Sequence, residues 1–428
     1  MKLFRSQVRA FGNPRRTFPR ELAIFLLVVF LLWTISLLDV SHPTGAFHLN
    51  VRFIGLLRWD PQGDLLCCRT NFSVLHTTQF FNKGFTWNYP APCILIYRFF
   101  YLFQYWGSSA VVAAYFIVVV VPIVLADVLL QAALYRRGLT RAQAIFFVSA
   151  ATLLSWPICY SLARGNIEAL LWLGLALAAA LYFRGQWMSA AVLIGIMAAF
   201  KIYPVLFFAL FIRPRRYREM AVGFAATLVT TVSSLLYLGP TLTRAAWYTL
   251  RGIHYFIQGF STHYDPNALP VDHSAFILVK LLSAHHPQSL SVYLPRYEVV
   301  AGILALTVFI TRAWKMPRLN QVLAISVCMV LLPSISFDYT LQNLYIPWAW
   351  LCLLIVSSHR AGRKIPGAVP AMLCFAILLA PEIFLDFGQR IFAGPLKALT
   401  LMALIGISII YPFADERQYP CESAAETE

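Results

Sequence analysis

The sequence has few charged residues: Asp, Glu, Lys and Arg make up 12% of its 428 positions, while hydrophobic residues make up 60%. A chain of this length and apolarity does not have enough polar side chains to cover the surface of a soluble domain. Long apolar runs separated by short polar turns recur along the chain, which is typical of a polytopic membrane protein. The scarcity of charge therefore excludes a soluble enzyme or binding module.

Acidic residues are scarcer than basic ones, 18 against 34, so the formal net charge is +16. A strongly basic balance can indicate nucleic-acid binding when the charges form one patch. Here the Lys and Arg residues fall mostly in short turns between apolar runs, and basic turns favour the cytoplasmic side of a membrane. The charge therefore reports topology, and no nucleic-acid partner is expected.

The sequence also lacks the common catalytic motifs. It contains no nucleotide-binding glycine loop, no Ser-His-Asp pattern and no His/Cys cluster at metal-ligand spacing. The eight cysteines are scattered and predict neither a metal site nor a disulfide framework. No metal or other cofactor is therefore expected.

Twelve apolar segments qualify as membrane spans when a crossing helix needs about 20 residues and shorter ones pair in hairpins. They are 22–38, 109–134, 142–162, 166–183, 187–200, 204–212, 219–239, 298–311, 319–335, 341–358, 367–384 and 396–412. Segment 204–212 is too short for a straight crossing, so 187–212 is expected to form a helical hairpin or a partly re-entrant pair with Pro204 at its tip. The stretch 92–106 is half apolar and aromatic, which predicts an interfacial helix.

The basic turns alternate along the chain, and this alternation assigns the sides of the membrane. They hold Arg136, Arg137 and Arg141; Arg184; Arg213, Arg215, Arg216 and Arg218; Arg312, Lys315 and Arg318; and Arg360, Arg363 and Lys364. Both termini are then cytoplasmic. The fold class expected is an all-α polytopic protein of about twelve transmembrane helices, with re-entrant and interfacial helices in its outer loops.

This topology divides the chain into three parts. Residues 1–21 form a basic cytoplasmic N-terminus, 22–412 a single membrane domain and 413–428 a cytoplasmic tail. The two long outer loops, 39–108 and 240–297, carry many aromatic and polar residues. We expect a multi-pass protein of the plasma (inner) membrane whose active face is outside.

Lys201 lies between two apolar runs, in AAFKIYP. A lysine at bilayer depth costs on the order of 3 kcal/mol unless a cavity or a partner receives it. Two interpretations are equally supported: the side chain snorkels to the interface, or it binds an anionic ligand.

Most other unusual polar residues fall on the same predicted outer side. They include Asp60, Asp64, Tyr89, Arg164, Asn166, Glu168, His273 and Asp338. Each also has a structural interpretation: Glu168 begins a helix, where a carboxylate is favoured by the helix dipole, and His273 is placed to cap a short helix. From the residues alone, an enzyme acting on lipid-linked substrates and a transporter fit equally well.

Three stretches together resemble the bacterial polyprenyl-phosphate-mannose-dependent mannosyltransferases, glycosyltransferase family 87 of the glycosyltransferase C superfamily. FNKGFTWNYPAPCILIY (81–97) is similar to that family's aromatic-Tyr-Pro-Pro segment, which places Tyr89 in the motif. The segment 164–219 is similar to its Gly-Gln-x-Asn helix start, basic turn, apolar helix, Lys-x-x-Pro and closing basic cluster. LLPSISFDYTLQNLYIP (331–347) is similar to its Ser-Pro-x-Ser-Trp-Asp-His-Tyr segment.

The resemblance implies inverting transfer of a hexose from a polyprenyl-phosphate sugar to a lipid or glycan acceptor. An outer-loop aspartate would be the general base, and Asp64 is preferred here over Asp60. Lys201 and Arg164 would bind the donor phosphate. Five further residues are expected to contact sugar or acceptor, or to order the site: Tyr89, Asn166, Glu168, His273 and Asp338. The resemblance does not specify an oligomeric state.

The sequence departs from the family pattern at three places. NFSVLH puts Asn71 where the family's base usually opens an Asp-Phe-x-Val-Tyr-like run, and an amide cannot act as a carboxylate base. Asn166 and Glu168 stand where the family has the Gln and Asn of its Gly-Gln-x-Asn motif. Tyr339 stands where the Ser-Pro-x-Ser-Trp-Asp-His-Tyr segment has its histidine. These departures leave two rivals: a transporter or flippase of a lipid-linked or anionic solute, and an inactive homologue that binds polyprenyl-phosphate lipid.

Overall fold

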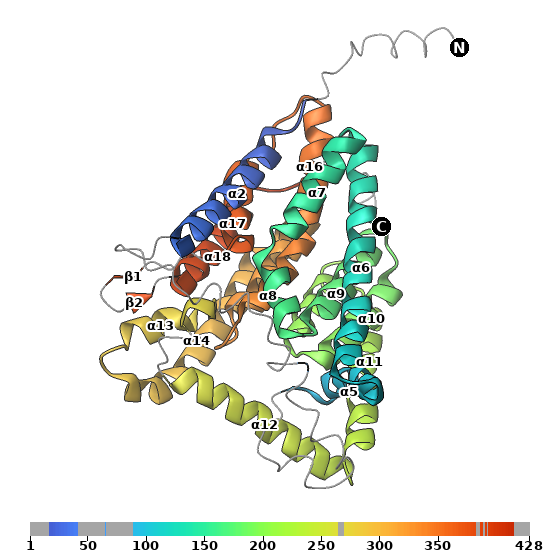
Figure 1. The fold of residues 1–428 in the computed structure, drawn as a ribbon, viewed down its shortest axis with the longest axis vertical. Helices are drawn as coiled ribbons and strands as arrows, with labels where there is room; N and C mark the ends of the chain where they lie inside the picture. The colour runs from blue at the N-terminus through green and yellow to red at the C-terminus, as the bar shows by residue number, and fades with distance from the viewer. Residues whose placement is uncertain are drawn as a thin grey trace.

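The structure is a computed structural model, and its helices form one elongated bundle (Figure 1). It describes residues 17–41, 65, 89–263, 269–381, 386–387, 390–391 and 393–414. The strands in these ranges are β1 (Asp386–Phe387) and β2 (Arg390–Ile391), which pair antiparallel over two residues each. The expected all-α class is therefore confirmed, whereas the expected N-terminal and C-terminal cytoplasmic segments lie almost wholly outside the described residues.

The described residues up to Leu238 contain eight α-helices and two 3-10 helices. They are α2 (Arg20–Ser41), α5 (Ala91–Tyr101), η2 (Leu102–Trp106), α6 (Ser108–Arg137), α7 (Arg141–Leu153), α8 (Trp156–Arg164), α9 (Glu168–Phe183), α10 (Trp187–Phe200), η3 (Tyr203–Phe211) and α11 (Tyr217–Leu238). Helix α5 with η2 occupies the region expected to form an interfacial helix.

The second half continues with helices that run across and along the bundle. They are α12 (Leu242–Thr262), η4 (Leu269–Val271), α13 (Phe276–Leu282), η5 (Pro287–Ser289), α14 (Leu290–Thr311), η6 (Ala313–Lys315), α15 (Arg318–Leu331), η7 (Asp338–Leu344), α16 (Tyr345–Arg360), α17 (Ala368–Leu379) and α18 (Ala393–Ile410). In Figure 1, α12 crosses the lower end of the molecule, where α5 also lies.

Each of the twelve expected spans overlaps a helix of the structure. Five helical stretches of the described chain are long and apolar enough to cross a membrane: Arg20–Leu37, Ser108–Arg137, Tyr217–Leu238, Pro287–Lys315 and Asp338–Arg360. Helices α7 and α8 together make a sixth candidate, bent by 50°. The other apolar helices are shorter, so twelve remains a prediction for the number of crossings.

Local sequence sets the helix boundaries next to this bend. Helix α7 begins with a capping box, in which the Thr140 side chain accepts from the Gln143 N–H and the Gln143 side chain accepts from the Thr140 N–H. Helix α8 begins after Ser155, whose hydroxyl accepts from the Ile158 N–H. The two caps satisfy backbone donors that would otherwise be unpaired in an apolar environment.

The expected hairpin at 187–212 is present, with its break one turn earlier than Pro204. Helix α10 ends at Phe200, Lys201 is extended (φ −143°, ψ 145°), and η3 begins at Tyr203. Proline is tolerated in the first turn of η3 because its missing N–H has no partner there. A 3-10 helix of nine residues is about 18 Å long, too short to cross the hydrocarbon core.

Helix α10 packs closely against α11 at two glycines. A Cβ at Gly195 would lie 2.1 Å from the carbonyl oxygen of Gly223, so neither position has room for a side chain. Thr227 Oγ1 donates to the Gly195 oxygen at 2.9 Å across the same contact. Small residues and hydroxyls are the usual means of close helix packing in lipid. This contact fixes α10, and with it the position of Lys201 at its end.

Candidate functional site

The ends of α9, α10 and η3 meet at an ion pair. Lys201 Nζ lies 2.8 Å from Glu168 Oε2, and the exposed fractions of the two side chains are 12% and 0%. Lys201 therefore does not snorkel to water, because its ammonium points into the protein. Burial strengthens the attraction between the two charges and makes each of them costly without the other.

The Glu168 carboxylate also holds two neighbouring elements. Its Oε1 accepts from Asn343 Nδ2 at 2.7 Å and from the Tyr203 hydroxyl. The carboxylate lies in the first turn of α9, where the helix dipole favours it, and Asn166 Oδ1 accepts from the Glu168 N–H at 2.8 Å. Glu168 therefore joins α9 to η3, to η7 and to Lys201.

Aromatic rings surround the Lys201 ammonium. Its Nζ lies 4.9 Å from the ring centroid of Tyr339 and 5.7 Å from that of Tyr89. These distances are within the range of cation–π attraction. The Tyr89 hydroxyl accepts from Asn166 Nδ2 at 3.3 Å, which ties the second ring to the start of α9.

A stack of rings extends from Tyr339 toward a second cation. Tyr339 stacks on Tyr160 with centroids 6.2 Å apart, and Tyr160 stacks on Trp156 at 6.0 Å. The Arg164 guanidinium lies 6.0 Å from the Tyr160 centroid. We call these residues together the Lys201 site: Tyr89, Trp156, Tyr160, Arg164, Asn166, Glu168, Lys201, Tyr203, Tyr339 and Asn343.

Besides Tyr89, a second described residue of the first long loop, Leu65, lies next to the Lys201 site. Gly165 has φ +67°, and a Cβ there would lie 2.5 Å from Leu65 Cβ. Leu65 follows Asp64 in the chain, but Asp64, Asp60 and Asn71 all lie outside the described residues. The identity of the general base therefore stays a prediction.

We expect Gly165→Ala to lower transfer activity severalfold and to destabilise the protein by at least about 1 kcal/mol, because the left-handed conformation and the contact with Leu65 both disfavour a Cβ. Turnover and unfolding of the purified variant would be measured beside Gly302→Ala, where a Cβ meets nothing within 4 Å. Equal turnover in both variants would show that Leu65 need not contact Gly165.

A second group of buried charges lies on the other side of η7. His273 Nε2 lies 2.5 Å and Lys397 Nζ 3.1 Å from Asp338 Oδ1, and all three side chains are almost fully buried. A carboxylate only accepts, so His273 Nε2 carries the proton. Asp272 next to it pairs with Lys280 at 2.9 Å. The His273 ring therefore binds Asp338 and does not cap a helix.

Helix η7 connects the two groups of charges. Its first residue, Asp338, binds His273 and Lys397, whereas Tyr339 and Asn343 contact the Lys201 site. The structure thus brings Lys201, Glu168, Asn166, Tyr89 and Arg164 together. His273 and Asp338 form an adjacent cluster.

Burial lowers the pKa of His273, and the nearby Lys397 adds to this, while Asp338 and Asp272 oppose it. The unfolded chain would take up a proton as the pH falls through about 6.5, and the folded protein only at lower pH. Stability is then fully present above pH 6.5 and declines below it, down to the folded pKa. We expect unfolding measured at several pH values to show this decline in wild type and a weaker one in His273→Gln. An equal decline in wild type and His273→Gln would show that the titration of His273 does not cause it.

Sequence reasoning missed Tyr203, Asn343 and Lys397. Lys397 carried the same signal as Lys201, a lysine inside an apolar segment, so it could have been found. Tyr203 and Asn343 carried no signal of their own, since their role depends on where η3 and η7 lie relative to Glu168. Within the described residues, no three His, Cys, Asp or Glu side chains gather as metal ligands, and cofactor independence stays a prediction.

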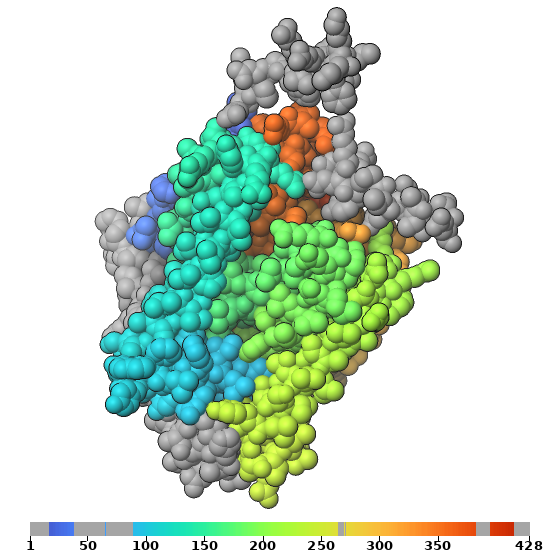
Figure 2. Space-filling view, turned by 90° about the vertical axis from the view of Figure 1, so that its right-hand side faces the viewer, coloured from blue at the N-terminus to red at the C-terminus, as the bar shows by residue number. Residues whose placement is uncertain are grey.

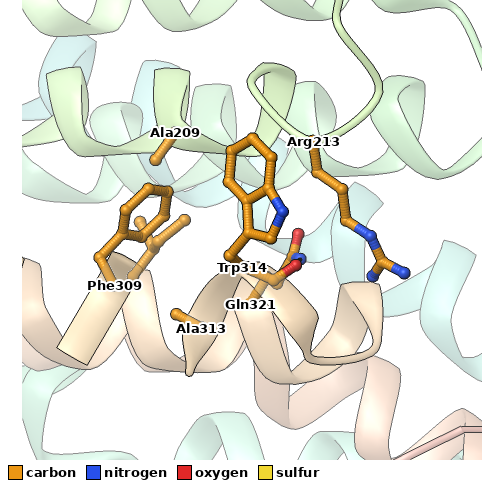
Figure 3. Close-up of a pocket in the computed structure, with 7 residues that line it drawn as sticks. Ala209, Arg213, Phe309, Ala313, Trp314 and Gln321 are labelled. Atoms are coloured by element: carbon orange, nitrogen blue, oxygen red, sulfur yellow. Dashed lines mark hydrogen bonds between the residues drawn. The ribbon is translucent and has the colours of Figure 1, made fainter. Parts of the chain in front are cut away.

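A small pocket lies at the opposite end of η3, between the basic turn and α14 to α15 (Figure 3). Trp314 and Gln321 face Arg213 there, and Arg213 Nη1 donates to the Met316 oxygen at 2.8 Å. The side chains that line the pocket are mostly apolar, and the Arg213 guanidinium is hydrogen-bonded to the backbone of the turn at Met316. The pocket is therefore a packing feature of the bundle and is separate from the Lys201 site.

Comparison with protein families connects these observations to a function. The model of glycosyltransferase family 87 matches residues 87–336, more than half of the chain. This match includes Tyr89, Arg164, Lys201 and His273 and ends two residues before Asp338. The comparison with curated proteins gave no match. The chain belongs to glycosyltransferase family 87 and is a membrane glycosyltransferase.

Proposed function

We propose that this glycosyltransferase transfers a mannose-like hexose, with inversion, from a polyprenyl-phosphate sugar to a lipid or glycan acceptor. The observation that supports this most is the Lys201 ammonium, held by Glu168 and flanked by Tyr339 and Tyr89. An ammonium suits a lipid phosphate, and aromatic rings suit the apolar face of a sugar. Burial favours binding at membrane depth, where a lipid-linked donor resides.

The reaction needs a base and a group that stabilises the leaving phosphate. We assign the base to Asp64, whose carboxylate takes the proton of the acceptor hydroxyl as its oxygen attacks the anomeric carbon. The bond from that carbon to the phosphate oxygen breaks, and polyprenyl phosphate leaves with one additional negative charge. Lys201 and Arg164 would stabilise this charge. Sugar, proton and charge are then all accounted for.

Glu168 has a positioning role in this proposal. Its carboxylate pairs with the Lys201 ammonium, which also lies near the rings of Tyr339 and Tyr89. A lysine has many rotamers, and fixing one of them lowers the cost of binding the phosphate. His273 and Asp338 would order the site through η7.

The location follows from the distribution of charge. Basic turns gather at the end of the molecule opposite Lys201 in the predicted topology, which favours an outward-facing site and cytoplasmic termini in the plasma membrane. A lipid-linked donor and acceptor would both reach the site from the bilayer.

The test is turnover of labelled polyprenyl-phosphate sugars by the purified protein in lipid, with a panel of acceptors. Release of polyprenyl phosphate together with labelled glycosylated acceptor is the expected result. Donor binding without release of polyprenyl phosphate, across the whole panel of acceptors, would favour the inactive homologue. This rival is relevant because Asn71 stands where the family usually has its aspartate base. Solute flux in liposomes without transfer would instead indicate a transporter.

A further inference from the structure

Helix α12 carries an exposed face that the proposed reaction does not use. It is 21 residues long, has no acidic residue and crosses the end of the bundle where α11 ends (Figure 1). Helix α11 runs down to it along the face shown in Figure 2. An amphipathic helix that lies across the ends of membrane spans is placed at the depth of the headgroups.

The helix has three stripes with different surroundings. Ala245, Thr249 and Gly252 are buried against the protein. A second stripe, shifted around the helix, is apolar and exposed, and contains Leu242, Leu250 and Phe260. A third stripe is polar and exposed: Arg244, Trp247, Arg251, His254 and Tyr255. Besides the buried first stripe, Phe260 at the end of the second stripe also contacts the protein, at Phe337.

The two arginines of the third stripe share this face and lie seven residues apart, two helical turns. No carboxylate in the described part of the chain pairs with either of them, and Arg251 instead contacts the Tyr255 hydroxyl at 3.3 Å. Trp247 is 64% exposed beside them. Arginine with tryptophan and tyrosine on one exposed face is typical of binding at anionic headgroups.

Element η2, which follows α5, also indicates a lipid interface at the end of the molecule where α12 lies. It carries Tyr105 and Trp106, which are 90% and 70% exposed. Large exposed aromatic side chains with polar tips are favoured at the headgroup level. Helices α5 and α12 both lie at the lower end in Figure 1, so the same depth is indicated from two separate segments.

We propose that α12 is a docking surface for anionic phospholipid, with Leu242 and Leu250 in the acyl region and Arg244 and Arg251 on the phosphates. On a helix that has no acidic residue, two arginines favour an anionic over a zwitterionic surface, because zwitterionic headgroups offer no net charge. The exposed apolar stripe supplies the second contribution to binding. This proposal does not depend on which sugar the protein transfers.

The docked helix would also support the Lys201 site. Phe260 and Phe256 near the C-terminal end of α12 contact Phe337, with ring centroids 5.7 Å and 6.4 Å apart. Phe337 in turn lies 5.7 Å from Tyr339, the ring beside Lys201. A lipid-bound α12 therefore contacts the residue that leads into η7.

The experiment uses the full chain in nanodiscs that contain phosphatidylglycerol and phosphatidylcholine in equal amounts. Photoreactive analogues of each lipid are cross-linked, and cross-links within residues 242–262 are counted by mass spectrometry. Wild type is expected to favour phosphatidylglycerol there. Arg244→Gln with Arg251→Gln is expected to lower this preference by about thirtyfold, and each single substitution by about fivefold.

Two further variants make the result specific. Arg136→Gln with Arg218→Gln removes the same charge elsewhere and should leave the preference at 242–262 unchanged. Arg244→Lys with Arg251→Lys keeps the charge and should keep the preference. The proposal fails when wild type cross-links the two lipids equally at α12, when no lipid cross-links there because protein covers it, or when the single and double glutamine variants match wild type.

Discussion

Replacing Lys201 with methionine is expected to lower the free energy of unfolding by about 3–5 kcal/mol. The substitution keeps the length of the side chain but leaves the Glu168 carboxylate buried without its counter-charge, and an uncompensated buried charge is strongly destabilising. Unfolding of the purified variant in mixed micelles would measure the change. Turnover is expected to fall as well, because the phosphate contact is lost.

The matched control adds Glu168→Gln to the same variant. Glutamine keeps the side-chain oxygen that accepts from Asn343 and Tyr203 but has no charge to compensate. We expect Lys201→Met with Glu168→Gln to recover most of the lost stability and none of the lost turnover. Recovery of both would show that Lys201 serves the fold alone.

The second large effect is expected at Asp64. Asp64→Asn removes the proposed base without changing its size, and general-base catalysis typically contributes about 10²- to 10⁴-fold in rate. We expect kcat to fall by that factor, with donor binding retained. Initial rates with a labelled polyprenyl-phosphate sugar, and donor binding measured separately, give the two quantities.

Asp60→Asn is the control for this prediction, because Asp60 lies in the same turn-rich stretch, WDPQGD. It should retain nearly full activity. An inactive Asp60 variant beside an active Asp64 variant would move the base to Asp60, and full activity in both would exclude either carboxylate as the base.

Much of the fold could be predicted because hydropathy alone identifies spans in a membrane, where every backbone group must be satisfied within a helix. The proline between apolar runs predicted a break near residue 204, and the structure has it three residues earlier, at Lys201. The number of crossings could not be settled this way. Segments such as α15 and α17 have 14 and 12 residues, fewer than a straight crossing needs.

Some residues of the Lys201 site could be singled out from the sequence, but the contacts between them could not. Lys201, Glu168 and Arg164 stood out because charge is rare in apolar segments. That Glu168 neutralises Lys201 depends on where α9 and α10 end, which the sequence does not specify. Asn343 is 175 positions from Glu168 along the chain, yet the two side chains are hydrogen-bonded. Such long-range contacts leave no local pattern.

The His273 cluster shows the same limit. His273 and Asp338 were each candidates, but their contact joins an outer loop to η7, and Lys397 reaches them from α18. A helix that carries a buried lysine needs a carboxylate somewhere, and only the packing shows which one.

We propose that the ammonium of Lys201 receives the phosphate of the lipid-linked substrate. The direct measurement is the affinity of polyprenyl phosphate for wild type and for the charge-balanced variant Lys201→Met with Glu168→Gln, with uncharged polyprenol as the reference ligand. A charge-assisted hydrogen bond of about 1.5–3 kcal/mol predicts a loss of roughly 10- to 150-fold for the phosphate and little change for polyprenol. Equal phosphate affinity in both proteins would contradict the account.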